Sequence, residues 1–130
     1  MTGISKPVIT LVGHCRPDIF ALTAAIKGFF PDAEVKTAND TSEMSMPSNL
    51  LLVNRILDGQ FPDESGIELI RGLPEDAPPA ILLTNFPEHA QAAIEAGAQP
   101  GFGKADARSP KAENAIRNAL AVSIHDESPT

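Results

Sequence analysis

Polar residues follow the apolar segments of this chain at points where an α/β protein would do its chemistry. Asn54 comes directly after the apolar run "LLLV", and the nearest following carboxylate, Asp58, comes four positions later. Thr84 closes the run "AILLT", and Lys104 follows "GFG". A carboxylate at a strand end can act as a nucleophile or hold a metal, whereas a neutral amide cannot be that nucleophile. Whether Asn54 or Asp58 ends its strand therefore decides which chemistry is open to the chain.

Short apolar runs that alternate with segments of helical period would position these residues. The predicted strands are Val8–Val12, Ala33–Thr37, Leu50–Val53 and Ala80–Thr84, with a weaker fifth candidate at Gly101–Gly103. Three of the runs are continuously apolar, which is typical of parallel strands that helices cover on both faces. The run Ala33–Thr37 alternates instead, and this favours an edge of the sheet.

Helical spacing of apolar residues predicts the connecting helices. A first helix runs to Phe30, with Asp18 available to cap it and Pro31 to stop it. Further helices are predicted over 66–73, 87–97 and 109–122. The segment Asn39–Asn49 is rich in turn-forming residues and predicts a reduced second helix of little more than one turn.

Strands and helices alternating in this way predict an α/β fold with a doubly wound parallel sheet. The flavodoxin-like arrangement, with five strands in the order 2-1-3-4-5, is the common solution at this size. We expect one domain over residues 1–130, with a core from about residue 7 to residue 122 and a flexible tail at 123–130. Ligands bind beyond the carboxyl ends of such strands. The expected rim consists of Gly13, His14, Asn54, Thr84 and Lys104.

Composition excludes several classes of function. The net charge is -7 and the ten basic residues are scattered, so no nucleic acid partner is expected. No apolar run approaches the roughly 20 residues of a membrane span, and the amino terminus lacks the pattern of an export signal. We therefore expect a cytoplasmic protein with no membrane contact. A single cysteine and three scattered histidines show no zinc-ligand spacing.

The rim positions, together with "GIELIRGL", "ILLTN" and "AIEAGAQPGFGK", resemble the receiver domain of two-component response regulators. The resemblance runs from about Val8 to Leu120 and implies the CheY-like form of the flavodoxin-like fold. In that family an acidic pair after the first strand and an aspartate after the third bind Mg²⁺, and that aspartate accepts a phosphoryl group. A threonine or serine on the fourth strand and a lysine after the fifth sense the phosphate.

The resemblance is incomplete at the positions that carry the family's chemistry. Thr84 and Lys104 match the sensing residues, but Gly13 and His14 stand where the acidic pair is expected. Gly101 and Ala105 stand where the family usually has an aromatic switch residue and a proline. These departures indicate a degenerate member of the family.

Two alignments of the third strand compete for the acceptor position. Asp58 lies 58 − 13 = 45 residues after Gly13, and it fits the family's loop pattern through Pro62 and Gly66. Asn54 lies 84 − 54 = 30 residues before Thr84, which also fits the family, whereas Asp58 gives 84 − 58 = 26. Burial favours Asn54, because Asp58 at the tip would draw the Arg55 charge into a central strand. Asp58 then lies in a loop about four residues longer than usual, which is a cheap insertion.

An amide at the strand tip predicts a domain that cannot be phosphorylated in the usual way. Mg²⁺ binding is not expected, because Gly13 and His14 supply no carboxylate. We expect Lys104 and Thr84 to hydrogen-bond Asn54 or nearby backbone, which would hold the domain in one state. The chain is then not an enzyme but a signalling domain that works through protein contacts.

The expected partner is a protein of a signalling pathway, such as a histidine kinase or an effector. A homodimer through the fourth and fifth helices, at 87–97 and 110–122, is a second expectation. Two alternatives stay open at this point. One is a phosphorelay receiver that uses Asp58 as its acceptor, and the other is a small-ligand sensor with a neutral pocket at His14 and Asn54.

Overall fold

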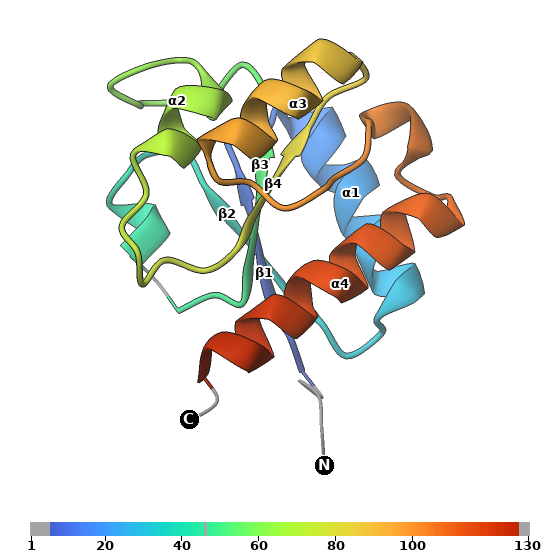
Figure 1. Ribbon diagram of the computed structural model, residues 1–130. Coiled ribbons are helices and arrows are strands. Elements are labelled where there is room, and N and C mark those ends of the chain that lie inside the picture. Colours follow the sequence, from blue (N-terminus) through green and yellow to red (C-terminus); the bar gives the residue numbers. More distant parts are fainter. Residues whose placement is uncertain (1–5, 46, 128–130) are drawn as a thin grey trace.

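A parallel four-stranded sheet lies between two pairs of helices in the computed structural model, which describes residues 6–45 and 47–127 (Figure 1). The strand order is β2-β1-β3-β4. The flavodoxin-like α/β class is therefore confirmed. In chain order the elements are β1 (Val8–Val12), α1 (Arg16–Phe29), β2 (Glu34–Ala38), the 3-10 turn η1 (Glu43–Ser45), β3 (Leu50–Asn54), α2 (Gly66–Arg71), β4 (Ala80–Leu83), α3 (Pro87–Ala96), the 3-10 turn η2 (Lys104–Asp106) and α4 (Pro110–Glu127).

The continuous apolar runs reflect a sheet that is buried on both faces. Along β3, Leu50 and Leu52 pack in one core cluster with side chains of α1 and α4. The alternate residues Leu51 and Val53 pack in a second cluster with side chains of α2 and α3. Because successive side chains of a strand point to opposite faces, a strand covered on both sides needs apolar residues at every position.

The outer strands differ from the central pair. β2, whose sequence alternates, forms one edge and pairs only with β1 among the strands of the sheet. At the other edge the predicted fifth strand contracts to a single parallel bridge between Ile81 and Gln99, with the Gln99 amide donating to the Ala80 carbonyl at 2.8 Å. Pro100 has no N–H to extend this pairing, and the glycines that flank Phe102 have no side chains to pack on it. Phe102 itself is a core residue.

The second crossover helix is reduced, as the turn-forming composition predicts. Within the described residues of segment 39–49, the helical structure is η1 alone. Glu43 and Asp40 tie this turn to the backbone: the Asn39 amide donates to Glu43 Oε1, and the Glu43 amide donates to Asp40 Oδ1. Three residues of 3-10 helix cover much less of the sheet than a full crossover helix would.

The first helix begins earlier than predicted, which changes the role of Asp18. Cys15 takes the N-cap position without a side-chain hydrogen bond, and Pro17 lies in the first turn, where its lack of an N–H costs nothing. Asp18 is therefore inside the first turn of α1 and does not cap it. Its carboxylate is left available for a contact outside the helix.

At the carboxyl end of the chain, α4 continues to Glu127, past the predicted end of the core at residue 122. Residues 128–130 of the predicted flexible tail lie outside the described residues, so that tail stays a prediction. Among the described residues, no helix combines the length and the apolar character that crossing a membrane requires.

Candidate functional site

The carboxyl ends of β1, β3 and β4 meet at one rim of the sheet. Val12 pairs with Val53, and Asn54 pairs with Leu83, so the residues that follow these strands lie on neighbouring positions. The segment after the bridge at Gln99 adds Lys104 beside β4. The structure thus brings the predicted positions to a common edge, although their roles there stay predictions.

Asn54 is the last residue of β3, and both N–H groups of its side-chain amide are bound to backbone carbonyls. The half-buried side chain donates from Nδ2 to the Gly13 carbonyl at 3.0 Å and to the Ile56 carbonyl at 2.8 Å. The first bond joins the ends of β1 and β3, and the second shapes the start of the following loop. A carboxylate could make neither bond, because both partners are acceptors.

Gly13 is held in a backbone conformation and a space that other residues do not fit. Its φ is 73°, in the left-handed region. A Cβ at this position would lie 2.5 Å from Leu57 Cδ2 and 3.0 Å from Leu57 Cα. Leu57, which is buried, therefore occupies the space that a side chain at position 13 would need. Sterics as well as backbone conformation hold this position to glycine.

Asp58 lies in the lengthened loop after β3, exposed to solvent. The loop is pinned over the rim by backbone bonds: the Asp58 amide donates to the Gly13 carbonyl at 2.9 Å, and the Gln60 amide donates to the Asn39 carbonyl at 2.7 Å. Farther along, the Leu57 amide donates to the Glu64 carbonyl at 2.7 Å. It is the backbone of Asp58, and not its carboxylate, that contributes to the rim.

His14 is a neutral buried residue. Its side chain is 2% exposed, and Nε2 lies 2.9 Å from the Leu52 carbonyl, an acceptor, so this nitrogen carries the proton. Nδ1 is buried without a hydrogen-bond partner among the described residues. Burial lowers the pKa of His14 to about 4, against a smaller raising effect of the Leu52 bond. The imidazole ties the end of β1 to β3 and brings no charge to the rim.

Lys104 forms an ion pair with Asp18, in contrast to the expectation that it would bond Asn54 or nearby backbone. Lys104 Nζ lies 2.5 Å from Asp18 Oδ2, and the two side chains are 31% and 33% exposed. The ammonium group holds the pKa of Asp18 below its usual range. The expectation was wrong because it took Asp18 as a helix cap, whereas Pro17 starts α1 early enough to free that carboxylate.

Thr84 also has a local partner in place of Asn54. It follows the last residue of β4, and its Oγ1 accepts a hydrogen bond from the Phe86 amide at 3.2 Å, at the start of α3. Nearby, a Cβ at Gly101 would lie 2.5 Å from Ile81 Cγ2. No aromatic switch residue fits at position 101, so the coupling between threonine and aromatic residue that the family uses lacks its second member here.

The rim does not fit a magnesium ion. Mg²⁺ is held through carboxylates and water in octahedral geometry. The nearest rim positions offer a glycine, a buried neutral imidazole and an amide whose N–H groups point at Gly13 and Ile56. Among the side chains that the structure describes, those of residues 6–44 and 47–122, no three from His, Cys, Asp or Glu come together as a metal site.

Asp18 and Leu57 complete the rim, and the sequence interpretation assigned neither of them to it. The sequence signal for Asp18 was Pro17, which suits a first turn and moves the helix start toward Cys15. For Leu57 the signal was an apolar residue three positions past the strand tip, inside a loop that is otherwise polar. Neither signal says which rim residue the side chain will contact.

The fold and this rim define the class of protein that the chain resembles. No family model matches the sequence, and no curated protein matches it. Solved structures do match, and among them are response regulators and their receiver domains. The non-phosphorylated receiver domain of the stress response regulator RcsB from Escherichia coli has a TM-score of 0.66 at 20% identity, over 87% of this chain and 93% of that one.

Two further structures show the same fold. RcsB from Salmonella typhimurium, in a structure on conformational dynamism for DNA interaction, has a TM-score of 0.67 at 16% identity, over 100% of this chain and 72% of that one. The chemotaxis response regulator CheY4 of Vibrio cholerae has a TM-score of 0.61 at 15% identity, over 91% of this chain and 98% of that one. The chain therefore has the fold of receiver domains.

Proposed function

We propose that this chain is a receiver-like signalling domain that acts through protein contacts in a single state, without phosphorylation. It is not an enzyme and needs no Mg²⁺. The proposal makes it a component of a signalling pathway in the cytoplasm, with a histidine kinase or an effector protein as its partner.

The observation that carries the proposal is the pairing of Lys104 with Asp18. In the receiver family the corresponding lysine meets the phosphoryl group, and its charge must be available for this. Here a carboxylate from α1 neutralises it at 2.5 Å. Asn54 and Thr84 are likewise occupied by backbone groups of the same chain. An incoming phosphoryl group would find neither a nucleophile at the strand tip nor an unpaired ammonium group at Lys104.

An NMR titration tests this proposal directly. Magnesium and beryllofluoride, a phosphoryl mimic, are added to the labelled protein. The amide resonances of Asn54, Thr84 and Lys104 should stay in place. Shifts that saturate at these residues would show a working phosphoryl site and would contradict the proposal.

Acetyl phosphate tests the alternative acceptor. After incubation with acetyl phosphate and Mg²⁺, a phosphate-affinity gel should show no retarded band. A retarded band that disappears in Asp58→Asn would instead establish Asp58 as an acceptor. Glu64→Gln, on the same exposed loop, is the matched control and should behave as the unaltered protein does.

The partner surface that we propose is the side of the molecule formed by α3, the segment 101–103 and the start of α4. Phe86 and Ile94 expose 53% and 41% of their surface there. They line a groove of about 410 Å³ together with Gln91, Phe102 and Lys111. Exposed apolar residues around a groove mark a surface for protein contact, and the same surface is proposed for the homodimer.

Pull-down from the native cytoplasm tests this surface. Ile94→Asp should lose the captured partner, whereas Ile56→Asp, at a similarly exposed isoleucine in the loop after β3, should keep it. Lys104→Ala should also keep it, because a phosphorylation-independent contact does not need the sensing lysine. Loss of the partner in Lys104→Ala with an intact fold would contradict the single-state proposal.

A further inference from the structure

The reduced second helix leaves a groove on the face of the sheet that α2 and α3 cover. Its walls are η1 on one side and α2 on the other, and Leu51 of β3 forms part of its floor. The groove measures about 600 Å³, and its apolar lining includes Met44, Phe61, Leu69 and Leu73. A full crossover helix between β2 and β3 would have covered this face. The groove is thus an apolar surface whose usual covering element is missing from the chain.

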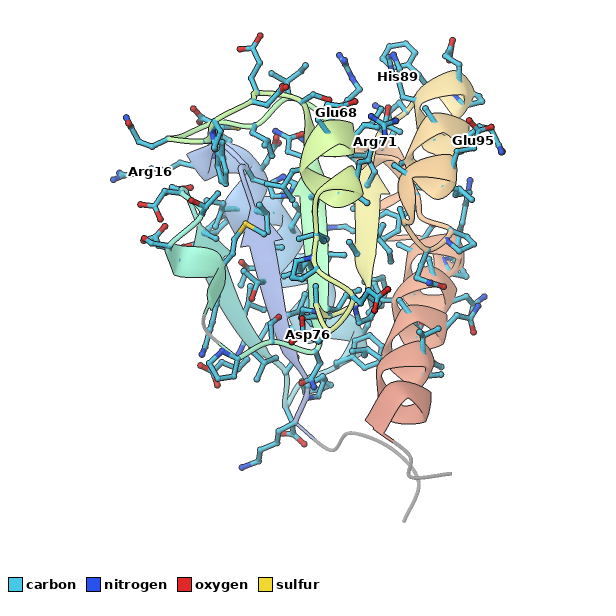
Figure 2. All side chains as sticks on the ribbon, turned by 60° about the vertical axis from the view of Figure 1, so that its left-hand side comes forward. Arg16, Glu68, Arg71, Asp76, His89 and Glu95 are labelled. Carbon is cyan, nitrogen blue, oxygen red and sulfur yellow. The ribbon has the colours of Figure 1, made fainter. Side chains whose placement is uncertain are left out.

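The charged residues that line this groove are all acidic. Asp63, Glu68 and Asp76 line it, and no lysine or arginine does. In Figure 2, Glu68 lies near the carboxyl ends of the strands and Asp76 near their amino ends, so carboxylates stand toward both ends of the groove. Glu68 pairs with Arg71 on α2, whereas Asp76 has no hydrogen-bond or ion-pair partner in the described part of the chain. An occupant should therefore be apolar at its centre and basic at its ends.

The outer face of α1 has this complementary pattern. Phe20 is 79% exposed, more than any other large apolar side chain of the described residues. Arg16 precedes it by four positions and Lys27 follows it by seven, on the same face, about 16 Å apart along the helix axis. Both cations are exposed, and neither has an ion-pair partner among the side chains of residues 6–44 and 47–122. No acidic residue lies on this face.

We propose that the groove binds α1 of a second copy of this chain. Phe20 of one copy enters the apolar groove of the next, with Arg16 and Lys27 against the carboxylates at its ends. This is helix-in-groove recognition, in which the second copy supplies the missing crossover helix. The two surfaces lie on opposite faces of the sheet, because α1 packs in one core cluster and α2 in the other.

Opposite placement makes the contact heterologous. Two copies cannot satisfy each other's groove and helix at the same time, so the association extends head to tail. It involves neither the rim nor the surface of α3 and α4, so it is independent of the proposed function. The contact consists of one aromatic anchor and two charged side chains. Because this is a small contact, we expect it to form only at high protein concentration.

Two variants that each remove one half of the contact test the proposal. Phe20→Ser removes the anchor, and Glu68→Lys with Asp76→Lys reverses the charge of the groove; all three positions are exposed, so the fold should survive. In sedimentation velocity over a range of concentrations, the unaltered protein should grow beyond the dimer. Each variant alone should associate about tenfold more weakly or worse. Mixed together, the two variants should form a one-to-one dimer that grows no further.

Matched controls keep the test specific. Ile56→Ser removes an exposed isoleucine from the loop after β3, and Glu75→Lys reverses a charge beside Asp76 that does not line the groove. Both should associate as the unaltered protein does. The proposal fails if the unaltered protein stays monomeric up to its solubility, which would leave the groove to a helix of another protein. It also fails if Phe20→Ser still associates, or if the two variants together form no dimer.

Discussion

At the scale of single residues, the rim is stabilised by groups that replace charge with hydrogen bonds. Asn54 donates twice to carbonyls, and His14 donates once, all within the chain. Carboxylates gathered at one edge would repel one another and would need a cation. The rim instead holds one carboxylate, Asp18, which Lys104 neutralises. Hydrogen bonds from neutral side chains and this one ion pair therefore hold the rim together.

Asn54→Asp should destabilise the protein without restoring an acceptor. The new carboxylate would face the Gly13 and Ile56 carbonyls with no proton to donate, so we expect a loss of roughly 1–3 kcal/mol in the free energy of unfolding. Urea denaturation measures the loss. Asn85→Asp is the matched control, because Asn85 Oδ1 accepts from the Ala105 amide and an aspartate oxygen can do the same. Equal stability of Asn54→Asp and the unaltered protein would refute this account of the rim.

His14 should make stability depend on pH in a defined interval. Its pKa in the folded protein is about 4, below the ordinary value of 6.5, so between these values the unfolded chain binds a proton that the folded chain does not. The free energy of unfolding should therefore have its full value above pH 6.5 and decrease as the pH drops toward 4. The total loss is roughly 3 kcal/mol.

His14→Gln should remove this slope from urea unfolding curves recorded at a series of pH values, because glutamine can still donate to the Leu52 carbonyl but does not titrate. His89→Gln, on α3, is the control that should leave the slope in place. A slope that persists in His14→Gln would assign the pH dependence to other groups.

At the scale of elements, the lengthened loop after β3 acts as a cover for the rim. Leu57 packs on Gly13, and the loop backbone bonds to Gly13 and Asn39. The buried side chain of Leu57 thus fills the space beside Gly13. Its entropic cost is small, and the burial of Leu57 offsets it.

Gly13→Ala should be strongly destabilising because the new Cβ meets Leu57 and the backbone stays at φ 73°. We expect a loss of about 2–4 kcal/mol, the sum of left-handed strain and overpacking. Gly28→Ala, inside α1 with no atom within 4 Å of the new Cβ, should instead gain about 0.5–1 kcal/mol. Thermal and urea unfolding of both variants would check the contrast. Similar effects of the two substitutions would mean that Leu57 does not hold position 13 to glycine.

At the scale of the whole molecule, the domain should be stable without metal. A ligand that binds the folded chain raises its melting temperature, and a rim whose carboxylate, Asp18, is already paired with Lys104 gives Mg²⁺ no site. Millimolar Mg²⁺ or EDTA should therefore leave the melting temperature unchanged. Calcium is a suitable control for non-specific effects of a divalent ion on this acidic chain. A melting temperature that rises with Mg²⁺ concentration, and not with calcium, would show that the ion binds.

Local sequence patterns determined the parallel α/β fold, the reduced second helix and the polar residues at the strand ends. These features depend on short-range physics: unbroken apolar runs suit strands buried on both faces, and turn-forming residues suppress a helix. The cost of burying charge also favoured Asn54 over Asp58 as the end of the third strand, because a charged Arg55 cannot lie inside a central strand. The carboxyl end of β3 at Asn54 follows from the sequence itself.

Only the tertiary structure decided which rim groups meet. Lys104 and Asp18 are 86 residues apart, and the sequence offered Asp18 an equally good local role as a helix cap. The contact of Leu57 with Gly13 depends on how a loop folds back, which no periodicity records. The fifth strand contracts to a bridge because pairing needs both an N–H and packed side chains at one edge. Residue patterns indicate burial and local conformation. Which side chains contact one another at the rim depends on the distances between them, and these are set only when the sheet has formed.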